Sequence, residues 1–338
     1  MLTKGFSLPL KRNFFMNKKD WPLKMRIYHF LKKMFSPSPQ KKLKGDRSRF
    51  SKSTIHYNIE CDGITRDYYV FAPVWQEESK LLPLYIALHG LTGTASTHIR
   101  ASLLPLICEL NGGIVACPQG LEDVGMTGWN AGVEHYMSGK IIKLHGNYDD
   151  VGFINIMIDD LLSKYPIDEE RIFVLGFSMG GFLVNRLAIE CGDRFRAFCS
   201  INGTIGNLLW GKEPKCPINI LHIHGTADES VRYQPIPTKH HKPHGIGAEQ
   251  LVEFWRNYNG CSSEPHIFDY PHVTDNEITF QRREYYGGKK GARIAFIKVT
   301  KGIHTFYDGL NYDISSMVEI MRFFANAPLL RQNTDNTQ

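Results

Sequence analysis

Short apolar runs alternate with segments of helical periodicity from about residue 52 onwards. Six runs lack polar alternation, as expected of strands buried on both faces: 83–88, 113–116, 171–175, 196–201, 218–223 and 293–299. Apolar residues at helical spacing separate most of them, at 153–165, 181–191, 249–258 and 314–324. Strand-like runs at 54–59 and 67–71 flank Asp62-Gly63, a typical hairpin turn. The pattern predicts an α/β fold with a mostly parallel, eight-stranded sheet and helices on both faces.

Residues 1–50 differ from this pattern. They carry 14 Lys and Arg against 2 Asp and Glu, whereas the rest of the chain carries 26 against 32, which argues against a uniform nucleic-acid-binding face. Residues 22–35 predict a basic amphipathic helix that could contact a membrane or a hydrophobic particle; a helix packed on the domain or an unstructured tail is the alternative. We therefore divide the chain into a basic extension (1–50, with a linker at 36–50), a main domain (51–330) and a polar tail (331–338).

The overall composition, 42% hydrophobic and 22% charged, is that of an ordinary globular protein. No run approaches the roughly 18 apolar residues of a transmembrane helix, and no segment has the pattern of a secretory signal. The 7 cysteines are odd in number and contain no CxxC pair, so they fit neither a disulfide framework nor a zinc site. These features favour a cytoplasmic location, with secretion as the alternative.

The central motif is Gly176-Phe177-Ser178-Met179-Gly180, which joins a predicted strand to a predicted helix. This is the context of a nucleophile elbow, in which a serine lies at the tip of a sharp turn and the flanking glycines allow neighbouring backbone to approach. The following helix directs its free N–H groups at the same point. The motif predicts that Ser178 is a catalytic nucleophile.

A serine nucleophile needs a base and a carboxylate that orients the base, here expected in the order Ser, acid, His. Asp228 follows the strand predicted at 218–223, and His304 follows the last strand, at 293–299. We therefore predict a Ser178–Asp228–His304 triad. Four competing residues are less suited, because they follow no predicted core strand or lie in a solvated loop: Asp269, His272, Asp275 and Asp308.

The oxyanion of the reaction needs two backbone donors. One is expected to be the N–H of Met179, directly after the nucleophile, and the other to come from the loop at 88–93. Leu91 is the first choice and Thr92 the second. His89 is interpreted as a structural histidine that packs under this loop.

These motifs together resemble the esterase/polyhydroxybutyrate depolymerase family of α/β-hydrolases, which includes feruloyl-esterase-like enzymes. The resemblance runs from about residue 66 to 325 and rests on segments 66–73, 88–90, 117–120, 128–132, 149–153, 167–181, 224–228 and 302–304. It implies an α/β-hydrolase fold and hydrolysis of small or oligomeric carboxylic esters through an acyl-enzyme, without metal or cofactor. It also makes Trp129 and Asn130 candidate substrate contacts, with plain packing as the alternative.

Other interpretations stay open. The same triad could cleave a thioester or a peptide, or the fold could be a catalytically dead binding protein. A histidine cluster (His240, His241 and His244) suggests a metal site, but no carboxylate or cysteine lies nearby in the sequence. We interpret this loop, with Arg232 and Tyr233 before it, as part of a rim over the substrate cleft, and Tyr233 as a candidate substrate contact.

Overall fold

The computed structural model describes residues 54–73, 80–123, 125–137, 140–235 and 244–330. The predictions for the extension at 1–50, its amphipathic helix at 22–35, the linker at 36–50 and the tail at 331–338 lie outside these ranges, as do His240 and His241. In the part of the chain that is described, no helix has the length and apolar composition that a bilayer crossing requires.

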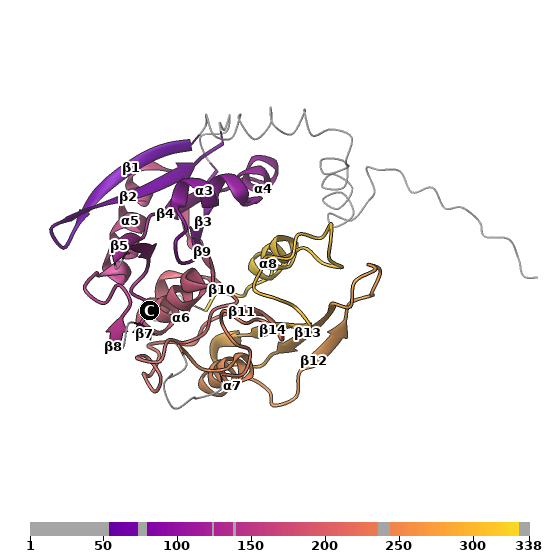
Figure 1. Cartoon of the computed structure of the whole chain (residues 1–338). Helices are drawn as coiled ribbons and strands as arrows, with labels where there is room; N and C mark the ends of the chain where they lie inside the picture. The colour runs from indigo at the N-terminus through magenta and orange to yellow at the C-terminus, as the bar shows by residue number, and fades with distance from the viewer. Residues whose placement is uncertain (1–53, 74–79, 124, 138–139, 236–243, 331–338) are drawn as a thin grey trace, which may run out of the picture. The chain divides into compact units, whose positions relative to one another are not determined.

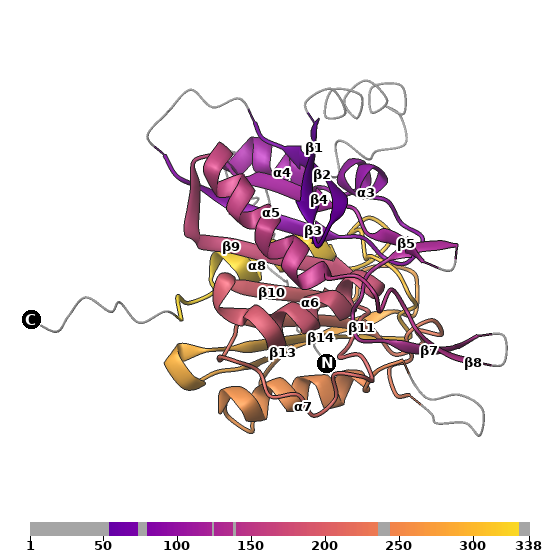
Figure 2. The ribbon, with the colours of Figure 1, turned by 90° about the vertical axis from the view of Figure 1, so that its left-hand side faces the viewer.

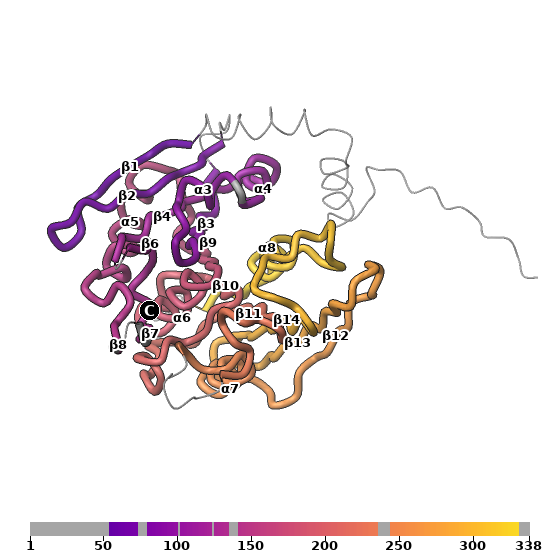
Figure 3. The backbone as a smooth tube through the Cα atoms, in the orientation of Figure 1, coloured from indigo at the N-terminus to yellow at the C-terminus, as the bar shows by residue number. Residues whose placement is uncertain are grey.

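One large sheet organises the main domain. Its order is β1 (Thr54–Cys61), β2 (Ile64–Phe71), β4 (Ile114–Pro118), β3 (Leu82–Leu88), β9 (Ile167–Phe177), β10 (Ala197–Ile201), β11 (Ile220–Gly225), β14 (Ile294–Thr300), β13 (Thr279–Tyr285) and β12 (His266–Asp269). The six strands from β4 to β14 are mutually parallel, whereas β1, β2, β13 and β12 pair antiparallel. The backbone trace in Figure 3 shows β1 and β12 at opposite ends of the sheet.

The sheet therefore has ten strands, and the prediction of eight was wrong in number. The first eight strands in the spatial order are the predicted ones. The two missed strands lie at the far edge of the sheet: β13 mixes buried and partly exposed positions and contains the charged residues Arg282, Arg283 and Glu284, and β12 is exposed throughout. Neither has the continuous apolar run by which the central strands were found.

Helices cover both faces of the sheet, as predicted (Figure 1). One face packs against α5 (Asp150–Lys164), α6 (Met179–Cys191) and α7 (Ala248–Asn259); in Figure 2, α5 and α6 lie in front of the strands. The other face packs against α3 (Ala95–Ala101), α4 (Leu104–Asn111) and α8 (Ser316–Ala325). Short 3₁₀ turns are η2 (Gly192–Arg194) and η3 (Lys289–Gly291). Two small hairpins, β5 (Leu121–Asp123) with β6 (Met126–Gly128) and β7 (Glu134–Met137) with β8 (Lys140–Lys143), precede α5.

The parallel register brings several loops to one edge of the sheet. Gly176 of β9 is level with Leu88 of β3 and with Ser200 of β10. On the other side of β10, β11 and β14 end together, with Gly225 level with Val299. In open α/β sheets, functional side chains gather beyond the carboxyl ends of the strands. The loops that follow β3, β9, β11 and β14 therefore form the candidate site.

Candidate functional site

The turn between β9 and α6 has the strained geometry expected of a nucleophile elbow. Half-buried Ser178 has φ 56° and ψ −120°, a conformation that residues other than glycine rarely adopt. The flanking glycines are required: a Cβ on Gly176 would lie 2.2 Å from the carbonyl oxygen of Gly180, and one on Gly180 would lie 2.3 Å from that of Leu88. The tight turn therefore presents the serine at the edge of the sheet.

The predicted acid and base lie in direct contact. Asp228 Oδ2 is 2.7 Å from His304 Nδ1, and the other carboxylate oxygen accepts the N–H groups of Ser230 at 2.9 Å and Val231 at 2.8 Å. The Asp228 side chain is fully buried, whereas 20% of the His304 side chain is exposed. A buried carboxylate fixed by two backbone donors is suited to orient the imidazole and to stabilise its charged form.

His304 also contacts the strand that carries the serine. Its ring centroid lies 4.8 Å from that of Phe177, the residue before Ser178. Within the described ranges, Ser178 Oγ and His304 Nε2 make no hydrogen bond; in hydrolases without substrate this contact is often long. His304 thus has one ring nitrogen bound to the carboxylate, and the other has no partner among the described residues.

The loop after β3 lies against the elbow. A Cβ on Gly90 would lie 3.3 Å from Ser178 Cβ, so this backbone passes directly beside the nucleophile. The N–H of Thr92 donates to the carbonyl oxygen of Thr127 at 2.8 Å. Thr92, the second choice for the oxyanion donor, is therefore excluded because its N–H is already used. The N–H of Leu91 has no partner among the described residues, and that of Met179 opens α6, where helical N–H groups are free.

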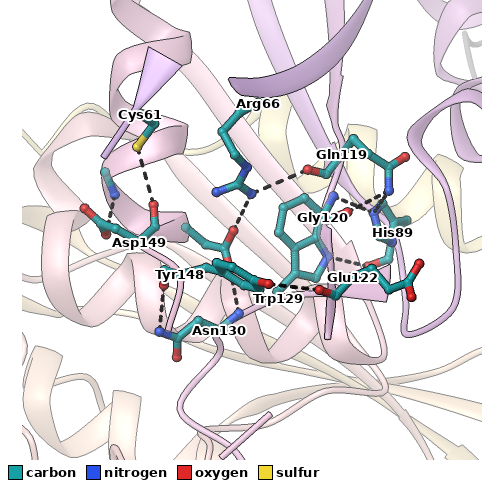
Figure 4. Close-up of polar contacts among 12 residues, drawn as sticks. Cys61, Arg66, His89, Gln119, Gly120, Glu122, Trp129, Asn130, Tyr148 and Asp149 are labelled. Carbon is teal, nitrogen blue, oxygen red and sulfur yellow. Dashed lines mark hydrogen bonds and ion pairs between the residues drawn. The ribbon is translucent and has the colours of Figure 1, made fainter. Parts of the chain in front are cut away.

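Trp129 and Asn130 both make hydrogen bonds to neighbouring loops (Figure 4), but only Trp129 is buried. The Trp129 side chain is fully buried and its Nε1–H donates to the carbonyl oxygen of His89 at 2.8 Å. The Asn130 amide donates to the carbonyl oxygens of Tyr148 at 2.8 Å and Gly146 at 3.3 Å. The prediction that Trp129 contacts substrate was wrong, because its side chain is buried. Asn130 is partly exposed, so its contact with substrate stays a prediction.

Tyr233 likewise lies beneath the surface. Its side chain is buried, its hydroxyl donates to Glu249, and its ring makes an edge contact with that of His224 at 5.7 Å. A buried phenol whose hydroxyl is bound to a carboxylate is not available to substrate. The prediction of Tyr233 as a rim residue was wrong, because its contacts with Glu249 and His224, which are distant or hidden in the sequence, bury it.

Comparison with known proteins finds similarity to esterases. Residues 76–242 match the family model described as Phospholipase/Carboxylesterase. The chain is 27% identical to the putative esterase NocK of Nocardia uniformis over 67% of its own length and 66% of the relative, and 27% identical to feruloyl esterase B of Piromyces equi over 68% and 41%. It thus spans less than two thirds of either relative. The acetyl xylan esterase of Aspergillus awamori, 16% identical, superposes with a TM-score of 0.57 over 80% of this chain and 99% of that one.

The chain has the α/β-hydrolase fold and is similar in sequence to carboxylic ester hydrolases. The predicted fold and the predicted relationship to carboxylic ester hydrolases are confirmed by these comparisons.

Two buried histidines behind the acid were missed from the sequence. His224 Nε2 lies 2.8 Å from the carbonyl oxygen of Val231 and 3.6 Å from Asp228 Oδ2, while its Nδ1 lies 3.1 Å from His222 Nε2. His222 Nδ1 in turn lies 3.1 Å from the carbonyl oxygen of Ser200. The two carbonyl contacts and the contact between the rings need three ring protons, and two neutral imidazoles supply two. Burial lowers the pKa of both histidines, which favours the neutral pair and leaves one contact without a proton. The signal was the presence of two histidines in a strand that is buried at every position.

Within the described ranges, no three His, Cys, Asp or Glu side chains are grouped so that they could hold a metal ion.

Proposed function

We propose that this chain is a serine hydrolase that cleaves carboxylic esters of small-molecule or oligomeric substrates. The observation that carries the proposal is the contact of 2.7 Å between Asp228 and His304, in the loops after β11 and β14. This pair belongs to the same edge of the sheet as the strained elbow of Ser178. The names of the relatives, a putative esterase and a feruloyl esterase, support the same bond type.

The residues have the following roles in this proposal. His304 Nε2 takes the proton of Ser178 Oγ as the oxygen attacks the ester carbonyl, and buried Asp228 stabilises the imidazolium that forms. The N–H groups of Met179 and Leu91 stabilise the oxyanion of the tetrahedral intermediate. His304 then protonates the leaving alkoxide, which produces an acyl-enzyme. Water repeats the cycle and releases the acid.

The experiment is hydrolysis of nitrophenyl esters of increasing acyl length by the purified protein. Feruloyl esters, acetylated xylan, hydroxybutyrate oligomers, a thioester and an amide complete the panel and define the preferred bond and acyl group. Ser178→Ala should lower turnover by a factor of about 10⁴ to 10⁶ and abolish labelling by a fluorophosphonate probe. Equal activity of the wild type and Ser178→Ala would refute the proposal.

We also propose that the protein resides in the cytoplasm. The 7 cysteines carry free thiols in the structure, and five of them are buried, which suits a reducing compartment. Alkylation of the native protein in freshly lysed cells, followed by mass spectrometry, should find all of these thiols reduced.

A further inference from the structure

The loop 89–93, which carries the second proposed oxyanion donor, is hydrogen-bonded to the β5–β6 hairpin and to Trp129, which follows β6. Four hydrogen bonds connect the loop 89–93 to the segment 120–129, which contains β5 and β6 (Figure 4 shows those of His89). They join Gly120 N to His89 Nε2 at 3.0 Å, Trp129 Nε1 to the His89 carbonyl oxygen at 2.8 Å, Thr92 N to the Thr127 carbonyl oxygen at 2.8 Å, and Thr127 Oγ1 to the Gly93 carbonyl oxygen at 2.7 Å.

These contacts assign the protons of His89. Its Nε2 accepts from the backbone N–H of Gly120, so a neutral ring carries its proton on Nδ1. Nδ1 lies 2.8 Å from the carbonyl oxygen of Gly90 and therefore donates to it. Burial lowers the pKa of His89 to about 4, against a smaller opposite effect of the bond to Gly90. The ring is thus neutral, and its tautomer is fixed, near neutral pH.

The bond to Gly90 sets the direction of the Leu91 N–H. The carbonyl group of Gly90 and the N–H of Leu91 belong to one planar trans peptide unit, in which the two bonds point in opposite directions. The Gly90 oxygen accepts from His89 Nδ1 at 2.8 Å and from Gly93 N at 3.0 Å. Because two donors hold the oxygen on one side, the N–H is held on the other.

Trp129 fixes the preceding peptide unit in the same way. Its indole N–H binds the His89 carbonyl oxygen, and its ring lies against the imidazole with centroids 4.7 Å apart. The residue is fully buried, so water cannot replace the indole as a donor. We propose that Trp129 is a positioning residue that, through His89 and Gly90, aims the N–H of Leu91 at the oxyanion. This inference rests on the proposed function.

The chain offers a matched control. Trp255 on α7 is also buried, and its indole N–H also makes one buried hydrogen bond, to Asn185 Oδ1 at 3.2 Å. The changes Trp129→Phe and Trp255→Phe each remove one indole N–H and a similar volume from the same side of the sheet. Both should lower stability to a similar extent, but only the first should disturb the oxyanion loop.

The experiment compares wild type, Trp129→Phe and Trp255→Phe by kcat, KM, fluorophosphonate labelling and inhibition by an aryl boronic acid, which forms a tetrahedral adduct with the serine. For Trp129→Phe we expect kcat and boronate affinity to fall together by about 10-fold, less than the loss of a whole oxyanion donor, with KM within about 2-fold. Trp255→Phe should keep kcat within about 2-fold. If Trp129→Phe does not fold, 3-benzothienylalanine at position 129 keeps the ring size without the N–H.

The outcomes separate the two proposals. A wild type that is neither labelled nor active refutes the proposed function. A labelled and active wild type with an unchanged Trp129→Phe, or with equal losses of kcat in the two tryptophan variants, refutes the positioning role alone.

Discussion

His89 and His304 both lie in loops at the carboxyl edge of the sheet, after β3 and β14, yet the two loops hold their imidazoles in opposite ways. His89 is 1% exposed, and both ring nitrogens are bound to backbone groups of the protein. His304 has a side chain that is 20% exposed, and in the described part of the chain its ring is hydrogen-bonded to Asp228 alone.

The difference indicates what separates a supporting imidazole from a reactive one. A histidine that acts as the base needs a ring nitrogen that is free to accept the proton of the serine hydroxyl. It must also be able to carry the positive charge that results. His89 meets neither condition because burial opposes its protonation. His304 meets both, since the carboxylate of Asp228 lies next to it and solvent reaches its ring.

Of the changes that test this difference between the two histidines, His304→Ala should have the largest effect on activity. We expect kcat to fall by about 10⁴-fold, because the reaction loses its base, while the free energy of unfolding changes by about 1 kcal/mol or less. Ester hydrolysis and urea denaturation measure the two effects. A small loss of kcat would mean that another group serves as the base.

His89→Leu should have the opposite pattern: a large loss of stability and a smaller loss of turnover than His304→Ala. The change leaves the Gly120 N–H buried without an acceptor and the Gly90 oxygen with one donor fewer, so we expect a loss of about 3 kcal/mol in the free energy of unfolding. Turnover should fall by about 10- to 100-fold, through the oxyanion loop. His56→Leu is the control: this exposed histidine pairs with Asp67 on the surface, and its loss should change stability by less than about 0.5 kcal/mol.

Acid should weaken the fold through His89. Its pKa of about 4 in the folded chain lies below the ordinary value of 6.5, so the unfolded chain binds the proton first as the pH falls. Stability from this residue is complete above pH 6.5 and is lost as the pH falls towards 4, by about 3 kcal/mol in total. The advantage of wild type over His89→Leu in urea denaturation should shrink over this range. A constant difference would show that His89 is not held neutral.

Thr127→Val should have the smallest effect. It removes the hydroxyl that donates to the Gly93 carbonyl oxygen but keeps the shape of the side chain and the backbone bond to Thr92. We expect a loss of about 1 kcal/mol in stability and a decrease of a few-fold in kcat. Thr65→Val, in an exposed pair with Glu60, is the control and should leave kcat unchanged.

The sequence predicted the parts of the site that depend on strand order. Ser178, Asp228 and His304 each follow a strand with a continuous apolar run, and such strands are recognisable because both of their faces are buried. The structure brings Asp228 and His304 together as expected. The interpretation of His89 as a structural histidine is confirmed by its burial.

The errors have a common physical cause. Trp129 and Tyr233 look like surface aromatics in sequence, but whether a loop residue points outward depends on tertiary contacts, here with His89 and Glu249. The choice between Leu91 and Thr92 depended on a bond to Thr127, 35 residues further along the chain. Partly exposed edge strands such as β12 carry no continuous apolar pattern and so were missed.

The conformation of Ser178 has an evolutionary consequence. A residue with a side chain at φ 56° and ψ −120° is less favourable than glycine there by about 1 to 3 kcal/mol. A lineage released from selection for catalysis would thus become more stable by the single change Ser178→Gly. Descendants that had lost their nucleophile in this way would be expected to keep the fold and to melt at higher temperature.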